Sequence, residues 1–162
     1  MTADDRTFML RALTLAQRAA DAGEVPVGAV IVQGGQVIGE GWNQPIHSCD
    51  ASAHAEIIAM RQAGHRTGNY RLPGAILYVT IEPCTMCVGA MIHARIERVV
   101  FGASEPKGGA LVSQLQLTQQ MHWNHRLLFE GGLEATAAAE LMQTFFKMRR
   151  ERVKRLKRQS QE

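Results

Sequence analysis

The sequence predicts a single α/β domain. Segments with apolar residues at helical spacing alternate along the 162-residue chain with short apolar runs that are rich in β-branched residues. This order is typical of a sheet that is covered by helices. The chain is long enough to bury a core of its own, and no internal repeat or linker divides it.

The first half of the chain predicts a helix, a hairpin and a second helix. Residues 4–22 carry apolar side chains at helical spacing and are followed by Gly23. The run "VGAVIVQGGQVIGEGWN" at 27–43 places a glycine pair between two β-branched stretches, which is typical of a tight hairpin. The run "AHAEIIAMRQAG" then predicts a helix that stops at Gly64.

The second half predicts three strands and two helices. The stretch "AILYVTIE" at 75–82 has the apolar character of a buried strand, and it leads directly into a helix over "PCTMCVGAMIHARIE" at 83–97. The strand "RVVFGA" follows at 98–103. After a loop rich in Gly and Gln, we expect a strand at "RLLFE", 126–130, and a long helix from about Leu133 into the basic tail.

Cysteine usage and hydropathy indicate a soluble, cytoplasmic protein. Three cysteines, an odd number, are expected to stay reduced in that compartment. The first 23 residues alternate charged and apolar positions and lack the apolar stretch of a signal peptide. No later apolar run approaches the length of a membrane span, so we expect no membrane partner.

The net charge of +3 is unevenly distributed. The segment from Lys147 onward holds eight of the eighteen Lys and Arg residues but two of the fifteen acids, so it carries +6 while residues 1–146 carry −3. A basic helix on a mildly acidic body indicates an anionic partner such as nucleic acid, and the alternative is a solvated helix end. We therefore treat 151–162 as a basic helical extension of the domain formed by 1–150.

The motif "PCTMC", Pro83 to Cys87, places two thiols at the start of a predicted helix. Residues three apart lie on one face of a helix, so Cys84 and Cys87 can approach one point. Backbone N–H groups and the positive end of the helix dipole favour thiolates there. The pair is suited to a zinc site or to a redox dithiol, whereas a structural disulfide is the least favoured interpretation.

A zinc site needs a third ligand, and His54 is suited to that role. It lies at the start of the helix predicted at 53–64, and parallel strands that carry successive helices would bring both helix starts to the same end of the sheet. His54, Cys84 and Cys87 would then bind one zinc ion per chain and leave a fourth position for water, as in catalytic sites. Glu56 would lie beside the metal, where a carboxylate can accept a proton from that water.

Other candidate ligands are less suitable. Cys49 lies a few residues before His54, but a fourth thiolate would close the site, so we interpret Cys49 as a small buried or loop residue. The remaining histidines have no partner at metal spacing and are expected on the surface or in packing contacts: His47, His65, His93, His122 and His125.

The combination of "HAE" with "PCTMC" about thirty residues later resembles the signature of the cytidine and deoxycytidylate deaminase superfamily. Further stretches are similar, in the same order, to bacterial tRNA-specific adenosine deaminases: "EVPVGAVIV", "GEGWN", "AHAEIIAMRQ", "NYRL", "LYVTIEPCTMCVGAMIHARI", "RVVFGA", "NHR" and "FFKMRR". They cover most of the chain from Glu24 to Arg150, so this resemblance is more specific than the zinc signature alone.

The resemblance implies a fold, a reaction and a catalytic set. The fold would be α/β with three layers, α-β-α, around a central mixed five-stranded sheet, and the protein would act as a homodimer. The reaction would be hydrolytic deamination of adenosine to inosine at the wobble position of a tRNA anticodon stem-loop, with release of ammonia. By position, His54, Cys84 and Cys87 match the zinc ligands of the family, and Glu56 matches its catalytic proton shuttle.

The same resemblance implies three substrate contacts. Asn43 would read the base edge, the backbone of Ala55 would lie near the reacting carbon, and Glu105 would lie beside the ribose. Family members usually carry Asp where this chain has Glu105, and the following "PKGGALVS" also departs from the family pattern.

Two other functions remain open from the sequence. A deaminase of guanine, cytosine or free nucleosides would keep the zinc residues without needing the basic tail. A zinc-stabilised nucleic-acid-binding module would keep the tail and the metal, but it would have no use for Glu56 beside an open coordination position.

Overall fold

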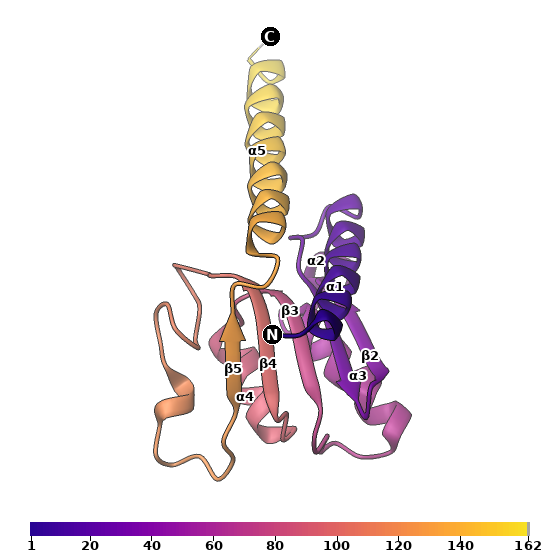
Figure 1. Ribbon diagram of the computed structural model, residues 1–162. Helices are drawn as coiled ribbons and strands as arrows, with labels where there is room; N and C mark the ends of the chain where they lie inside the picture. The colour runs from indigo at the N-terminus through magenta and orange to yellow at the C-terminus, as the bar shows by residue number, and fades with distance from the viewer. Residues whose placement is uncertain (162) are drawn as a thin grey trace.

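A mixed five-stranded sheet lies at the centre of the molecule (Figure 1). In this computed structural model, which describes residues 1–161, the strand order is β2-β1-β3-β4-β5. β1 pairs antiparallel with both β2 and β3, whereas β3, β4 and β5 are parallel. The five predicted strands are confirmed, with the bounds β1 (Gly28–Gln33), β2 (Gln36–Trp42), β3 (Ile76–Ile81), β4 (Arg98–Ala103) and β5 (Leu128–Gly131).

Helices cover both faces of this sheet and complete the predicted three layers. On one face, α1 (Ala3–Asp21) packs on β1 and β3, and the beginning of α5 (Ala135–Gln159) packs on β4 beside it. On the other face, α3 (Ala55–Thr67) covers β2 and β1, and α4 (Thr85–His93) packs against α3. The short helix α2 (Pro45–Ser48) and the single turn η1 (Leu117–Gln119) lie in connecting loops.

The distal part of α5 projects away from the layers, as Figure 1 shows. This helix is 25 residues long and passes from residue 150 to residue 151 without a break. Its last turns are exposed and carry the basic residues of the tail. Neither α5 nor any other helix within residues 1–161 has the apolar length needed to cross a lipid bilayer.

The strands divide their side chains between two apolar clusters, because successive residues of a strand point to opposite faces. One cluster, against α1, takes Val30, Tyr78 and Val100. The larger cluster, against α3 and α4, takes the neighbouring residues Ile31, Leu77 and Val99. The sheet is thus buried on both sides, which explains its nearly continuous apolar strand sequences.

Two glycines of β2 let α3 lie close to the sheet. A Cβ atom on Gly39 would lie 2.3 Å from the carbonyl oxygen of Ala59, and one on Gly41 would lie 2.3 Å from that of Ala55. Any side chain at either position would push the helix outward. The "GEG" sequence therefore sets the position of the first turns of α3, where the predicted site residues lie.

Two predicted helix ends were wrong. The helix expected to stop at Gly64 continues to Thr67 and ends at Gly68, whose φ of 67° is the left-handed conformation that favours glycine. A glycine inside a helix costs only about 1 kcal/mol relative to alanine, and here helix packing outweighs that cost. The helix predicted at 83–97 ends at His93, because Arg95 adopts a positive φ of 59° that turns the chain into β4.

A buried ion pair connects the first helix to the sheet. Asp5 is 2% exposed, and its carboxylate accepts hydrogen bonds from Arg98 at 2.9 and 3.0 Å and from the Tyr78 hydroxyl at 2.7 Å. Arg98 also pairs with Glu130 of β5. The hydrogen bond from Arg98 outweighs the effect of burial and holds the pKa of Asp5 well below its usual range. The network joins α1, β3, β4 and β5.

Candidate active site

The starts of α3 and α4 lie at the same end of the sheet. β2 and β3 both run antiparallel to β1, so they point in the same direction, and each is followed by one of the two helices. The prediction that the two helix starts meet is confirmed, although β1 separates the two strands. His54 and Cys84 are the N-cap residues of α3 and α4, and both have extended backbone.

Neither N-cap side chain binds the backbone of its own helix. N-cap positions usually hold Ser, Thr, Asp or Asn, whose oxygen accepts a backbone N–H of the first turn. Here the imidazole of His54 and the thiol of Cys84 instead point toward each other, with Cys87 from the first turn of α4. These three side chains form the only group of at least three His, Cys, Asp or Glu within residues 1–161 that can converge on a metal ion.

The spacing of the three donor atoms fits zinc. His54 Nδ1 lies 3.6 Å from the Sγ atom of Cys84 and 3.6 Å from that of Cys87, and all three donor atoms lie within 4.8 Å of one another. A tetrahedral zinc ion with Zn–S bonds of about 2.3 Å and a Zn–N bond of about 2.0 Å requires N···S distances of about 3.5 Å, close to those found here. The donors therefore fit one zinc ion per chain, and three protein ligands leave one tetrahedral position open.

The thiol pair is electrostatically suited to a cation. The hydrogen bond from Cys87 lowers the pKa of the Cys84 thiol to about 4, and His54 contributes to the same shift. The pKa of Cys87 is raised, because it donates to Cys84 and is fully buried. The hydrogen bond to Cys84 also raises the pKa of His54. Two adjacent thiolates repel each other, so a divalent cation between them is what would allow both to ionise.

Glu56 lies in the first turn of α3, two residues after His54. Its side chain is 3% exposed, and burial raises the pKa of its carboxyl group. No Lys or Arg within residues 1–161 forms an ion pair with it. A buried carboxyl group without a fixed cationic partner, beside a metal donor set, has the properties of a group that takes up and releases a proton.

Asn43 and Ala55, two of the predicted substrate contacts, are joined by a hydrogen bond. Asn43 lies just after β2, and its Oδ1 accepts the backbone N–H of Ala55 at 2.9 Å. This bond satisfies the first N–H of α3, which the His54 side chain leaves free. It also distinguishes the oxygen of the Asn43 amide from its NH₂ group, and within residues 1–161 no hydrogen bond engages that NH₂ group.

Glu105, the third predicted substrate contact, lies in the loop after β4. It is partly exposed, and its Oε1 atom accepts the backbone N–H of Lys107 at 2.9 Å. Its own backbone N–H donates to Glu82 Oε1 at 3.2 Å. Glu82, which directly precedes Pro83 and Cys84, was not among the predicted site residues, although an acid at the end of an apolar strand is an available signal.

Cys49 is exposed and lies in the loop that follows α2. The predicted loop position is therefore confirmed, and the alternative of a buried Cys49 is wrong. It ends α2 in a left-handed conformation with φ of 47° and does not join the zinc donors.

Two histidines make the packing contacts expected of them. His47 Nδ1 lies 2.7 Å from the buried Glu24 carboxylate, and His125 Nε2 donates to the Ile96 carbonyl at 2.6 Å.

The fold and the donor set define the class of zinc-dependent deaminases. The family model for the cytidine and deoxycytidylate deaminase zinc-binding region matches residues 2–103. The tRNA-specific adenosine deaminase of Haemophilus influenzae is 48% identical over 151 residues, which are 93% of this chain and 87% of that protein. The protein of the same name from Agrobacterium fabrum is 44% identical over 143 residues, 88% and 94% of the two chains. The chain therefore belongs to the family of tRNA-specific adenosine deaminases.

Two solved structures of deaminases have a similar fold. A tRNA:A34 deaminase, studied for A-to-I editing at the wobble position of transfer RNA, superposes with a TM-score of 0.81 at 44% identity, covering 83% of this chain and 98% of that one. The guanine deaminase of Bacillus subtilis superposes with a TM-score of 0.60 at 45% identity, over 64% of this chain and 66% of that one.

Proposed function

We propose that the protein hydrolyses adenosine to inosine at the wobble position of a tRNA anticodon and releases ammonia. The observation that carries this proposal is the buried Glu56 carboxyl beside the open His54, Cys84 and Cys87 donor set. The relatives named tRNA-specific adenosine deaminase, which align over about nine tenths of the chain, support tRNA adenosine as the substrate.

The chemistry can be assigned to named groups. Zinc, when bound by His54, Cys84 and Cys87, supplies a Lewis acid that makes water a nucleophile near neutral pH. Glu56 accepts a proton from the attacking water and delivers it to N1 of adenine, which makes C6 electrophilic. The C6–O bond forms, and the Glu56 carboxylate then takes the second proton from the new C6 hydroxyl group and passes it to the amine. The C6–N bond breaks, which releases ammonia and leaves the C6 carbonyl of inosine. One carboxyl group thus serves both directions of proton transfer.

The substrate contacts follow from the groups that remain free. Because Asn43 Oδ1 is engaged by Ala55, the NH₂ group of Asn43 is the donor available to an acceptor on the purine edge. The backbone of Ala55, held by that bond, lies next to the reacting carbon in this assignment. Glu105 accepts from a ribose hydroxyl group.

We place the anticodon loop in a cleft along α5, called the α5 cleft below. The cleft combines apolar side chains (Ile46, Phe145 and Met148) with three arginines (Arg149, Arg152 and Arg155) and two acids (Asp21 and Glu151). Ile46, one of the lining residues, lies three residues after Asn43, and we propose that the anticodon loop reaches from the cleft to the zinc donors. Apolar and aromatic side chains next to arginines are typical of sites for unpaired nucleotides. Unstacking the target base costs less free energy in a flexible anticodon loop than in a duplex.

Because tRNA is the proposed substrate, we place the protein in the cytoplasm.

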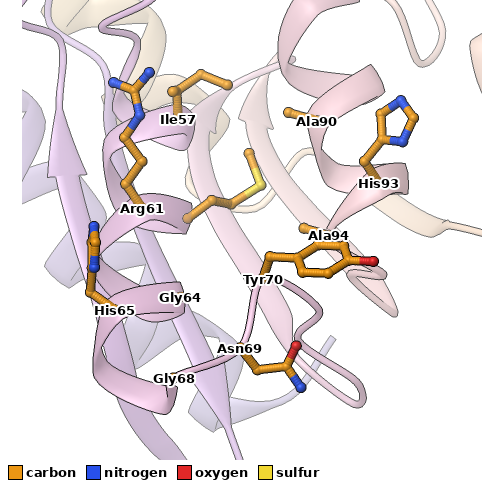
Figure 2. A pocket seen from close by; sticks show the side chains of 11 residues that line it. Ile57, Arg61, Gly64, His65, Gly68, Asn69, Tyr70, Ala90, His93 and Ala94 are labelled. Atoms are coloured by element: carbon orange, nitrogen blue, oxygen red, sulfur yellow. The ribbon is translucent and has the colours of Figure 1, made fainter.

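We also propose that the protein acts as a homodimer through the groove between α3 and α4 (Figure 2). The groove has an apolar floor that includes Ile57, Met60 and Ala90, and Tyr70 at its edge is 70% exposed. The aromatic ring and the groove lie on one face, as a two-fold symmetric interface requires, because each copy must then offer both parts. A second copy of the chain is therefore the partner proposed for this face.

Light scattering after gel filtration tests the dimer. Ala90→Arg introduces a charge into the groove and should produce a monomer, whereas Thr7→Arg on the exposed face of α1 should leave the mass unchanged. A wild-type protein that is monomeric at all concentrations, or an Ala90→Arg variant with the wild-type mass, would refute this interface.

Ammonia release tests the substrate class. The zinc-loaded protein is incubated separately with tRNA that carries a wobble adenosine and with free guanine, cytidine and adenosine. Release with tRNA alone supports the proposal. Release with free guanine instead would indicate the activity of the Bacillus subtilis relative, and no release with any substrate would leave a non-enzymatic zinc module.

A further inference from the structure

We propose that Glu82 is a positioning residue that holds the loop from Glu105 to Ser113 in the conformation that presents Glu105 to the substrate. This inference rests on the proposed function, because it assigns a role in substrate binding. Glu82 does not touch the substrate in this account. It acts through the loop that it binds.

The carboxylate of Glu82 accepts five hydrogen bonds from this one loop. Oε1 accepts the backbone N–H of Glu105 at 3.2 Å and the hydroxyl group of Ser113. Oε2 accepts the backbone N–H groups of Leu111 at 3.3 Å, Val112 at 3.0 Å and Ser113 at 3.0 Å. A carboxylate offers about four lone-pair sites, so the loop donors saturate it.

Glu82 carries its charge without a cationic partner. The side chain is 2% exposed, and within residues 1–161 no Lys, Arg or His forms an ion pair with it. Burial raises the pKa of the carboxyl group, but the hydrogen bonds from Ser113, Val112 and Glu105 outweigh this effect and lower the pKa overall. The loop amides thus form an anion-binding nest around a fixed carboxylate.

The loop lies so close to the Glu82 carboxylate that position 109 must be a glycine. A Cβ atom on Gly109 would lie 2.2 Å from Glu82 Oε2. Two backbone bonds complete the attachment: Gly109 N–H donates to the Glu105 carbonyl at 2.9 Å, and Ala110 N–H donates to the Pro83 carbonyl at 2.9 Å. The loop is therefore attached to the two residues that immediately precede Cys84.

The residues that hold the loop in place differ from the residues that would bind zinc. The zinc donors lie at the starts of α3 and α4, and within residues 1–161 no hydrogen bond from the loop reaches His54, Cys84 or Cys87 themselves. Glu105, by contrast, has its backbone N–H bound directly to Glu82. A change at Glu82 should therefore weaken substrate binding while zinc content and the chemical step remain.

Glu82→Gln is the main test, because it keeps the size of the side chain but turns an NH₂ donor toward backbone donors. We expect the KM for tRNA to rise about tenfold or more, the scale of one lost hydrogen bond to a charged group. We expect kcat to change by less than about threefold and zinc to stay at one per chain. Hydrogen exchange of the amides at 111–113 should become faster.

Two further variants distinguish positioning from general stability. Asp5→Asn removes a carboxylate of equal burial far along the chain from the loop, so it should lower the melting temperature without changing KM. Gly109→Ala pushes a methyl group into Glu82 and should raise KM as Glu82→Gln does. The two changes should be non-additive in the double variant, because they disrupt one contact.

The outcomes separate this role from the proposed function. A wild-type protein without activity on tRNA would refute the proposed function. An active wild type whose KM is unchanged in both Glu82→Gln and Gly109→Ala would refute the positioning role alone. Loss of zinc from Glu82→Gln would also refute it, because Glu82 would then support α4 rather than the loop. If Glu82→Gln does not fold, Gly109→Ala decides between these results.

Discussion

The arginines of the α5 cleft should make tRNA binding strongly dependent on salt. Arg149, Arg152 and Arg155 recur every three residues along α5 and line the same cleft, so they can follow one nucleic-acid backbone. Lys154 and Lys157 lie on the same helix but do not line the cleft. Replacing Arg152 and Arg155 by Gln therefore has a matched control, Lys154→Gln with Lys157→Gln, which removes the same charge from other faces of the helix.

The size of the effect follows from counterion release. Each contact with a single-stranded phosphate adds about 0.7 to the slope of log affinity against log salt. Loss of two contacts should make the slope shallower by about 1.4, so between about 50 and 200 mM salt the wild type should lose about sevenfold more affinity than the variant does. The control pair should keep a slope within about 0.5 of the wild type.

Fluorescence anisotropy with a labelled anticodon stem-loop measures these slopes. The measurement is made in the Glu56→Ala background, so that the ligand is not converted during the titration. Equal slopes for the cleft variant and the control variant would refute the assignment of the cleft. Removal of residues 152–162 should make the slope shallower by roughly 2 to 4 units, if three to five of its cations meet phosphates. Parallel lines with equal intercepts for full-length and truncated protein would show the tail to be a solvated helix end.

Four further predictions concern the site and the fold. Cys87→Ala should lose most of its zinc in metal analysis, whereas Cys49→Ala should keep one zinc per chain, and the reverse result would overturn the ligand assignment. Glu56→Ala should keep zinc and fold but lose at least about 10²-fold in turnover, the usual scale for a positioned acid and base, so near-normal turnover contradicts its role. Glu105→Ala should raise the KM for tRNA without changing the melting temperature, and an unchanged KM would make it a bystander. The pKa of Asp5 is depressed in the folded protein, so its stabilisation is complete above the unfolded pKa of about 3.9 and is lost as the pH falls below that value. The difference in melting temperature between the wild type and Asp5→Asn should therefore shrink below about pH 4, and a constant difference would exclude this linkage.

The zinc donors could be predicted because their positions depend on local chain geometry. A strand that runs into Pro83 and then a helix fixes Cys84 and Cys87 in one turn. His54 follows from the same reasoning, because the chain returns through β2 to the same end of the sheet before α3 begins. The spacing of apolar residues in strands and helices, and the proline and glycine residues at their ends, can be recognised in the sequence.

The contacts of Glu82 and Asp5 could not be predicted in the same way. The donors to Glu82 are mostly backbone N–H groups, and their direction depends on the path of the loop rather than on its residue types. The Asp5 and Arg98 pair spans 93 positions in sequence, so only the assembled sheet brings the two charges together. The end of α3 at Gly68 rather than Gly64 could not be predicted either. Both glycines are suitable helix ends in the sequence, and only the packing of the helix decides between them.

The most direct test of the proposed function is the identity of the wobble base after incubation. A tRNA with adenosine at the first anticodon position is incubated with zinc-loaded wild-type protein and, in parallel, with Glu56→Ala, and then sequenced by reverse transcription. Inosine is read as guanosine, so the account predicts an A-to-G change at that position alone, with one ammonia released per converted tRNA and no change with Glu56→Ala. An unchanged tRNA, or equal conversion by the Glu56→Ala variant, would contradict it.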